Sequence, residues 1–339
     1  MSLARLLWLI FCGILVTALG VYSLLTVYYS NLPFSWLRLG AAIVVAVPLL
    51  FLGWNSFLEH AWRARAGFIV LVAGIAGWWF LIPASHDRDW QEQVGRMPTV
   101  EIEGNRAIVR NLRDFEYRAR DEFDVRYYDK HIDLSRVRGV DFAVSNWGAD
   151  HIAHTMLSFE LDGLEWLTVS IETRLEKGES YDPLKGIFKQ FELIYVMGSE
   201  RDLIRLRTNY RDEKVFLYPS NASPEQARAL LTSILKEANQ ITEKPTFYHT
   251  LAKNCTSVLV SHINEVIDPD VPLDHKQLLT GYADELAYEL EHIKTPLPFD
   301  ELRKACNITK IANESDEDRD FSQTIRKARN AAVSAARSN

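Results

Sequence analysis

The segment around Cys255 contains the residue types that a thiol catalyst needs. Asn254 is a turn-forming residue, and Cys255 follows it at the expected start of a helix over residues 254–266. The N–H groups and the dipole at a helix N-terminus stabilise an anion, so this position favours the thiolate form of a cysteine. The same N–H groups can receive the oxyanion that forms when a thiolate attacks a carbonyl. A buried structural cysteine is the alternative interpretation.

A nucleophilic thiol needs a neighbouring base, and three histidines are candidates. His154 opens a β-prone run over residues 153–161, where a rigid strand would hold its ring in place. His151 lies three residues upstream, and His249 lies close to Cys255 in the sequence. We expect His154 to be the base, while the two other histidines compete for this role.

Glu172 is the candidate for the third member of a triad. It belongs to the run over residues 164–173, and the Asp162-Gly163 pair between the two runs indicates a tight hairpin. The hairpin would bring Glu172 beside His154, where a carboxylate can orient the imidazole and stabilise its cation. A surface ion pair between Glu172 and Arg174 is the alternative.

Basic and amide side chains provide candidates for substrate binding. Arg205, Arg207 and Asn209 alternate along an expected strand at residues 203–208, and together with Asn254 they are candidates for binding an anionic headgroup. An exposed, charged strand edge is the alternative explanation. Cys255 and Cys306 are able to form a disulfide outside the cytoplasm. The sequence shows no CxxC or His/Cys spacing typical of zinc and no sign of a cofactor.

The elements that would position these residues are strands first and helices last. Further strands are expected near residues 101–109, 140–144, 191–197 and 215–218, and further helices over residues 223–241 and 276–292. Ser223 and Pro224 form an N-cap signal for the first of these helices. The pattern predicts an α+β domain over residues 86–300, with an antiparallel sheet plus helices. Residues 301–339 are polar and charged and are expected to form a weakly ordered or helical tail.

Three uncharged apolar runs precede this domain, at residues 6–29, 39–58 and 66–85. A bilayer core needs about 20 apolar residues in a helix, so all three qualify as membrane spans. The first run is longer than the apolar part of a signal peptide and lacks a clear cleavage site. Residues 1–85 are therefore expected to form a three-helix membrane anchor.

Arginines flanking the runs indicate the orientation. Arg5, Arg63 and Arg65 lie on one side of the predicted spans, whereas Arg38 alone lies on the other. The excess of positive charge marks the cytoplasmic side, so the domain is expected in the periplasm. After residue 85 the chain carries 34 basic and 44 acidic residues, because four of its 38 basic residues and one of its 45 acidic residues precede that point. This net charge of −10 argues against a nucleic-acid partner.

Several motifs, in order, resemble those of a bacterial family that contains the periplasmic domain of the Lnb-type lipoprotein N-acyltransferases. They are Trp147-Gly148, the run from His154 to Phe159, Ser170 to Arg174, Glu176 to Glu179, Arg201 to Ile204, Arg207 to Asn209, and Asn254 to Thr256. Asp87 to Trp90 is similar to members with an N-terminal anchor. In the Lnb-type enzymes the membrane helices follow the domain, whereas in this sequence they precede it.

The resemblance implies a permuted papain-like fold, similar to lecithin–retinol acyltransferase, in which the histidine strand precedes the Asn-Cys helix. It implies Cys255 as nucleophile, His154 as base and Glu172 as third member. Three functions are considered. The first is a membrane-anchored acyltransferase that takes acyl groups from a membrane lipid or lipoprotein substrate through a thioester. The second is a cysteine hydrolase of peptide, cell-wall amide or lipid ester bonds. The third is a non-catalytic envelope binding module.

Overall fold

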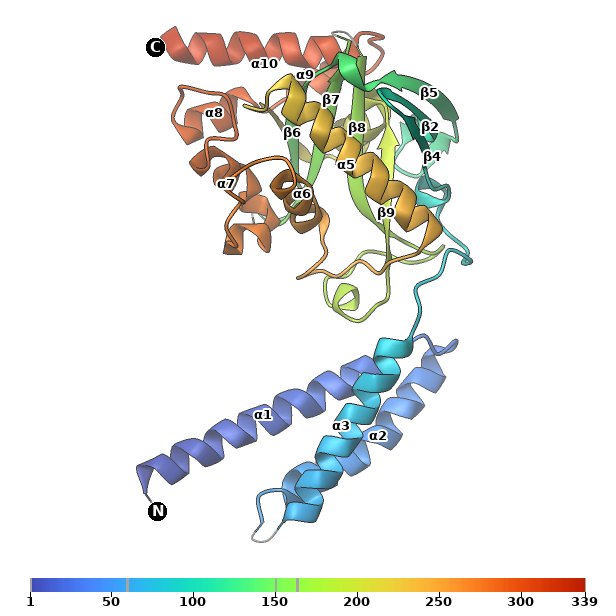
Figure 1. Cartoon of the computed structure of the whole chain (residues 1–339), viewed down its shortest axis with the longest axis vertical. Helices are drawn as coiled ribbons and strands as arrows, with labels where there is room; N and C mark the ends of the chain where they lie inside the picture. The colour runs from blue at the N-terminus through green and yellow to red at the C-terminus, as the bar shows by residue number, and fades with distance from the viewer. Residues whose placement is uncertain (1, 59–60, 150, 163–164, 339) are drawn as a thin grey trace. The chain divides into compact units, whose positions relative to one another are not determined.

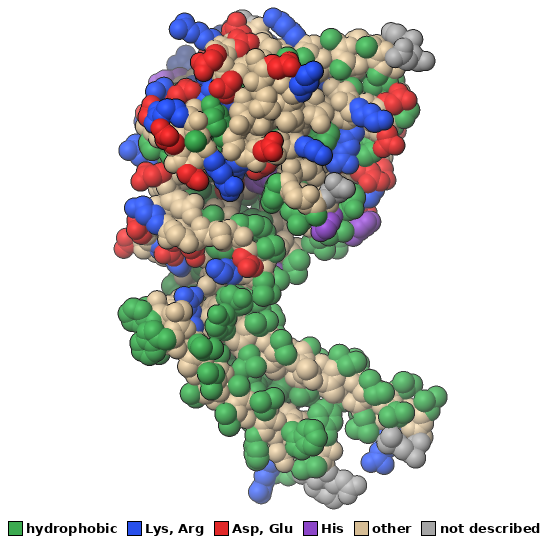
Figure 2. Space-filling model, turned by 180° about the vertical axis from the view of Figure 1, so that it is seen from behind, with side chains coloured by type: hydrophobic (Ala, Val, Ile, Leu, Met, Phe, Trp, Pro, Cys, Tyr) green, Lys and Arg blue, Asp and Glu red, His purple; other side chains and the backbone are tan. Residues whose placement is uncertain are grey.

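The three apolar runs form long helices. The computed structural model describes residues 2–58, 61–149, 151–162 and 165–338, and in it α1 spans Leu3–Tyr28, α2 spans Ser35–Asn55 and α3 spans Trp62–Leu81. Each helix is long and apolar enough to cross a membrane. Figure 2 shows apolar side chains covering these helices, while charged side chains are spread over the other part of the chain.

The chain divides into two compact units. The anchor unit comprises Met1–Asp87 together with two segments from later in the chain, Ser180–Glu192 and Phe247–His249. The sheet unit comprises Arg88–Glu179, Leu193–Thr246 and Thr250–Asn339. A continuous anchor over residues 1–85 therefore omits two segments that the structure groups with the membrane helices.

A mixed, eight-stranded sheet forms the centre of the sheet unit (Figure 1). Its order is β1-β2-β9-β8-β7-β6-β10, with β5 also paired to β2, while β3 and β4 form a separate pair. β2 meets β9 in a parallel bridge, and the pairs β1–β2, β2–β5, β6–β7, β7–β8 and β6–β10 are antiparallel. The strands are β1 Thr99–Glu103, β2 Arg106–Arg113, β3 Glu116–Ala119, β4 Glu122–Asp124, β5 Tyr127–Asp133, β6 Val137–Asn146, β7 Ala153–Leu161, β8 Glu165–Arg174, β9 Glu192–Gly198 and β10 Lys214–Pro219.

The predicted hairpin is the antiparallel pair β7–β8, in which Met156 faces Ser170 and Leu161 faces Glu165. Asp162 has a φ of 56°, the left-handed conformation that a tight hairpin turn needs. Gly163 and Leu164, the next residues of the predicted turn, lie outside the described residues. The register determines which side chains of the two strands lie side by side.

Apart from α4, the α-helices of the sheet unit follow its strands, in agreement with the α+β prediction. α5 spans Pro224–Glu243, and Ser223 caps it in a capping box with Gln226, which confirms the expected start. α6 spans Cys255–Asn264 and packs against β7 and β8. The sequence therefore predicted the fold class and the positions of α5 and α6.

The prediction of a strand at residues 203–208 is wrong. α4 spans Glu200–Arg205 and continues as a π-helical turn at Leu206–Tyr210. Ser199 caps α4 by accepting a hydrogen bond from the Asp202 N–H, which starts the helix before the alternating residues. The alternating arginines that resembled a strand pattern are Arg205 and Arg207, which are buried and paired with Glu116 and Glu172.

The helix expected at residues 276–292 is shorter than predicted. α7 spans Ala283–Glu289, and short 3-10 turns precede it at His275–Gln277 and Thr280–Tyr282. The Thr280 hydroxyl and the Gly281 N–H donate hydrogen bonds to the carbonyls of Ala153 and His151. These bonds hold the turn against the start of β7, so the helical pattern is interrupted there.

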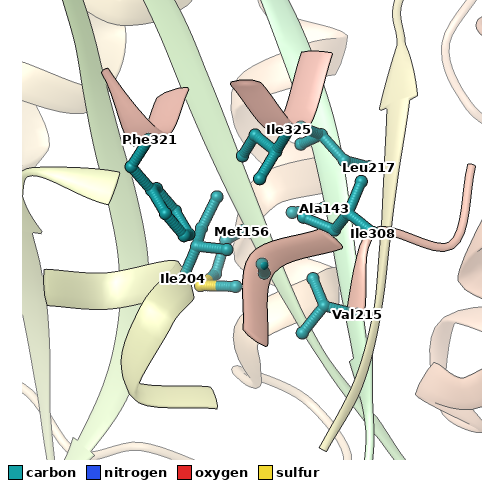
Figure 3. Packing of buried hydrophobic residues seen from close by; sticks show 9 residues of the cluster. Ala143, Met156, Ile204, Val215, Leu217, Ile308, Phe321 and Ile325 are labelled. Carbon is teal, nitrogen blue, oxygen red and sulfur yellow. The ribbon is translucent and has the colours of Figure 1, made fainter. Parts of the chain in front are cut away.

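The C-terminal segment is not a separate polar tail. It forms α8 (Phe299–Ala305), α9 (Thr309–Glu314) and α10 (Phe321–Ser338). Figure 3 shows Ile308, Phe321 and Ile325 packed with residues of the sheet and of α4 in one buried cluster. Arg326 and Arg329 of α10 are also buried and donate hydrogen bonds to Asp141. The predicted boundary at residue 300 therefore falls inside the folded domain.

Candidate active site

Cys255 is the first residue of α6, as the sequence predicts. Asn254 caps the helix: its side-chain oxygen accepts from the Ser257 N–H at 2.8 Å, and its own N–H donates to the Ser257 hydroxyl at 2.9 Å. The side-chain nitrogen of Asn254, Nδ2, donates to the Thr250 carbonyl at 2.9 Å. These bonds give Asn254, expected as a substrate ligand, a capping role, and they fix Cys255 where helix N–H groups lack intrahelical acceptors.

The thiol of Cys255 is buried, with 5% of the residue exposed. Burial raises the pKa of a thiol, but the charge of His154, a hydrogen bond to its ring, and hydrogen bonds from the Thr155 backbone and side chain act in the opposite direction. Together they lower the pKa of Cys255 to about 7. A substantial fraction of this thiol is therefore ionised at neutral pH.

His154 lies on β7 and is brought beside the thiol, as expected. Its Nε2 lies 2.6 Å from the Ser170 hydroxyl on the neighbouring strand β8. Ser170 in turn donates to Glu172 Oε1 at 2.7 Å, while the direct distance from His154 Nε2 to that oxygen is 3.5 Å. The same imidazole forms a hydrogen bond with the Cys255 thiol. The carboxylate orients the imidazole both directly and through a serine hydroxyl.

Glu172 carries a stable negative charge. Burial opposes ionisation, but the charges of His154 and Arg207 and the hydrogen bond from Ser170 hold the pKa of this carboxyl well below its usual range. Arg207 donates to Glu172 Oε1 at 2.7 Å. Arg174, the partner considered as the alternative, donates to the carbonyls of Val94 and Gly95.

Arg205, Arg207 and Asn209 have protein partners. Arg205 is 1% exposed and donates to Glu116 at 2.6 Å and to the Asp316 carbonyl at 3.0 Å. Asn209 donates to Asp316 Oδ1 at 2.8 Å. Neither an exposed charged edge nor an open headgroup site fits these contacts. They join α4 and the π-helical turn to β3 and the C-terminal segment.

The other two histidines differ from His154. His151 is exposed and precedes β7, and its backbone carbonyl accepts a hydrogen bond from Gly281. His249 is half-buried and belongs to the anchor unit. Burial lowers the pKa of its imidazole. The structure thus brings together Cys255 with His154 and Glu172, the three residues that the sequence proposed for the triad.

The cysteines are free thiols. Cys306 is buried in a cluster with Tyr218 and Leu302, and burial raises its pKa to about 12. It is therefore an inert packing residue, in contrast to Cys255. Among the residues that the structure describes, no group of His, Cys, Asp and Glu is arranged to hold a metal ion.

Sequence reasoning missed Ser170, Thr155 and the partnership of Arg207 with Glu172. Ser170 alternates with Glu172 on β8, so both point to one face of the sheet. Thr155 follows His154 directly, and its hydroxyl lies 3.2 Å from that of Thr256 on α6. Because side chains two residues apart on a strand share a face, the sequence could have indicated that Ser170 lies beside Glu172. The contact between Thr155 and α6 depends on tertiary packing and had no local signal.

The sheet, the capped cysteine helix and the histidine strand define a thiol-bearing α+β domain attached to membrane helices. Residues 123–284 match the model of the Lnb N-terminal periplasmic domain. This segment is a domain of that family, which confirms the resemblance seen in the sequence. With three candidate spans before it, the domain faces the periplasm from the inner membrane. No curated protein and no solved structure matches the chain.

Proposed function

We propose that the protein is a membrane-anchored cysteine acyltransferase of the permuted papain-like type, acting on lipid or lipoprotein acyl groups. The supporting observation is the array in which Cys255, with a pKa lowered to about 7, is coupled to His154 and through Ser170 to ionised Glu172. A low-pKa thiol beside an oriented imidazole is the arrangement that nucleophilic catalysis requires. The membrane anchor favours a lipid-borne substrate, because such a substrate stays in the bilayer.

The reaction has two steps. In the first, Cys255 Sγ attacks the carbonyl carbon of an ester, and His154 holds the thiol proton. The tetrahedral oxyanion is stabilised by N–H groups at the start of α6. As the C–O bond breaks, the imidazolium of His154 gives its proton to the departing alkoxide, which leaves as an alcohol and leaves a thioester on Cys255.

In the second step, an amine attacks the thioester carbonyl. His154 accepts the proton that the amine loses, and Glu172 stabilises the resulting imidazolium. The C–S bond breaks, an N-acyl amine forms, and the Cys255 thiolate is regenerated. Water in place of the amine would yield a free acid, which is the hydrolase reaction.

Mass spectrometry of the purified, full chain tests the first step. After incubation with membrane lipids or lipoproteins, the wild type is expected to carry an acyl thioester on Cys255. Cys255→Ser is expected to carry none as a thioester, and His154→Ala is expected to lose acylation while it still folds and inserts. His151→Ala and His249→Ala serve as matched histidine controls with minor effects. A His154→Ala protein acylated at the wild-type rate would refute the assignment.

The products distinguish the remaining possibilities. Lipid and lipoprotein mass spectrometry of cells with and without Cys255 is expected to show an N-acyl amine that depends on this thiol. A free acid instead would identify a hydrolase. No acyl adduct on the wild type, under conditions that trap thioesters, would support a binding module.

A further inference from the structure

The crossover between β8 and β9 contains a segment that is not accounted for by the thiol chemistry. Residues 180–192 follow the strand that carries Glu172, yet they group with the membrane helices. Phe247–His249, which precede Cys255 in the sequence, belong to the same unit. The anchor unit therefore contains segments that lie close in the sequence to two of the three triad residues, Glu172 and Cys255.

Segment 180–192 contacts the C-terminal ends of α1 and α3, which are the periplasmic ends of these helices. Phe188 is 2% exposed and stacks on Tyr29, with ring centroids 5.5 Å apart. The Gln190 side chain donates to the Tyr29 carbonyl at 2.6 Å. On α3, the Lys189 ammonium donates to the carbonyls of Trp79 and Ile82 at 3.0 and 3.2 Å. A cation at a helix C-terminus satisfies carbonyls that lack intrahelical donors and interacts favourably with the dipole.

The surroundings of this attachment have the composition of a membrane–water interface. The Lys189 ammonium lies 4.6 Å from the ring centroid of Trp79 and 5.3 Å from that of Phe247. Aromatic rings with lysine at the ends of membrane helices are typical of the headgroup layer. Tyr181 and Leu184 of the same segment are nevertheless 37% and 42% exposed. Leu184 gains little from exposure to water, but it would gain from contact with lipid.

We propose that segment 180–192 lies in the headgroup layer of the outer leaflet and contacts lipid through Tyr181 and Leu184. The occupant of this surface is the bilayer itself, because the segment is fastened to the outer ends of two membrane-spanning helices. Tyr248 of the anchor unit is seven residues before Cys255, and an extended chain covers at most 3.3–3.6 Å per residue. The stretch of chain that links Tyr248 to Cys255 is therefore short, at most roughly 25 Å when fully extended. Resting on the proposed function, this makes the acyl donor a lipid that remains in the outer leaflet.

Fluorescence quenching tests the location independently of catalysis. The full chain with Cys255→Ser and Cys12→Ala would carry a bimane label at Leu184→Cys, in vesicles of phosphatidylethanolamine and phosphatidylglycerol that contain a headgroup-nitroxide phosphatidylcholine. A label at Val125→Cys is the matched control, since Val125 is 44% exposed but belongs to the sheet unit. We expect quenching at position 184 and little at position 125. Equal, weak quenching at both positions would overturn the proposal.

A second experiment tests delivery of the donor. Leu184→Asp is expected to lower the rate of acyl-thioester formation on Cys255 from vesicle phospholipid several-fold, while the reaction of Cys255 with a small soluble disulfide is unchanged. Val125→Asp is the control and should keep both rates. Unchanged acylation in Leu184→Asp would refute a role in lipid delivery. An unacylated wild type would contradict the proposed function, whereas the quenching result would still decide where the segment lies.

Discussion

Replacing His154 by Ala should move the titration of the Cys255 thiol by two pH units or more. In the wild type the charge and hydrogen bond of His154 oppose burial and lower the pKa to about 7 from an ordinary 9.0. Without the imidazole, burial remains and most of the opposing interactions are lost, so the pKa should return to about 9 or higher. A difference of two units corresponds to about 2.7 kcal/mol between the two protonation states.

The pH dependence gives this prediction a characteristic form. At pH 7 about half of the wild-type thiol is ionised, against about 1% in the variant, roughly a 50-fold difference in thiolate. A thiolate of higher pKa is intrinsically more nucleophilic, by about 8-fold for two units when the Brønsted coefficient is about 0.45. The variant should therefore react about 6-fold more slowly at pH 7, yet faster than the wild type above about pH 8.

The assay is the rate of exchange with a small aromatic disulfide between pH 5 and 10, with Cys255 identified by mass spectrometry. Cys306 provides an internal control, because its pKa of about 12 and its complete burial should keep it unmodified. Rate profiles that cross between pH 7 and 10 are expected. Superimposable profiles for wild type and His154→Ala would show that the imidazole does not tune this thiol, and would refute the coupling derived from the structure.

Four further predictions concern the carboxylate, the core and the topology. Glu172→Gln should slow thioester formation less than His154→Ala does, as measured by acyl-adduct mass spectrometry, because Glu172 acts through the imidazole. Arg207→Gln should lower the free energy of unfolding by about 3 kcal/mol in denaturant titrations, since it leaves the buried Glu172 carboxylate without its cation; an unchanged stability would argue against a structural ion pair. Ile325→Ala should cost about 2–5 kcal/mol in the same titration, and a cost near zero would mean that α10 is a loose tail after all. A reporter fused after Asn339 should be active only if it functions in the periplasm, so cytoplasmic activity would contradict the orientation.

Local patterns in the sequence predicted the elements that local physics controls. Uncharged runs of about 20 residues leave few alternatives to membrane helices, and the three helices lie where the runs do. The Asp162-Gly163 pair predicted the β7–β8 hairpin, whose register places Ser170 and Glu172 near His154. The turn-forming Asn254 predicted a helix start at Asn254-Cys255, and α6 begins at Cys255. These signals span only a few residues, so they do not depend on the rest of the fold.

Errors arose where distant partners determine the structure. Arg326 pairs with Glu200 at 2.7 Å and Arg329 with Asp141 at 2.8 Å, across more than 120 positions in the sequence. A polar, Ala-rich segment with such charges is typical of a solvated tail, and only these partners show that it belongs to the core. Likewise, residues 180–192 belong to the anchor unit because they contact α1 and α3, which lie more than 100 positions earlier in the sequence.

The alternating arginines at positions 205 and 207 show why charge patterns need their partners. In the sequence they suggested a surface for binding an anion, but the anions are part of the protein: Glu116 for the first and Glu172 for the second. The charges of His154 and Arg207 keep Glu172 ionised, and the charge of His154 also lowers the pKa of the Cys255 thiol. Charges of alternating sign thus extend from a buried arginine to the thiol. Arg207 is therefore a buried partner of Glu172 and not an exposed ligand for an external anion.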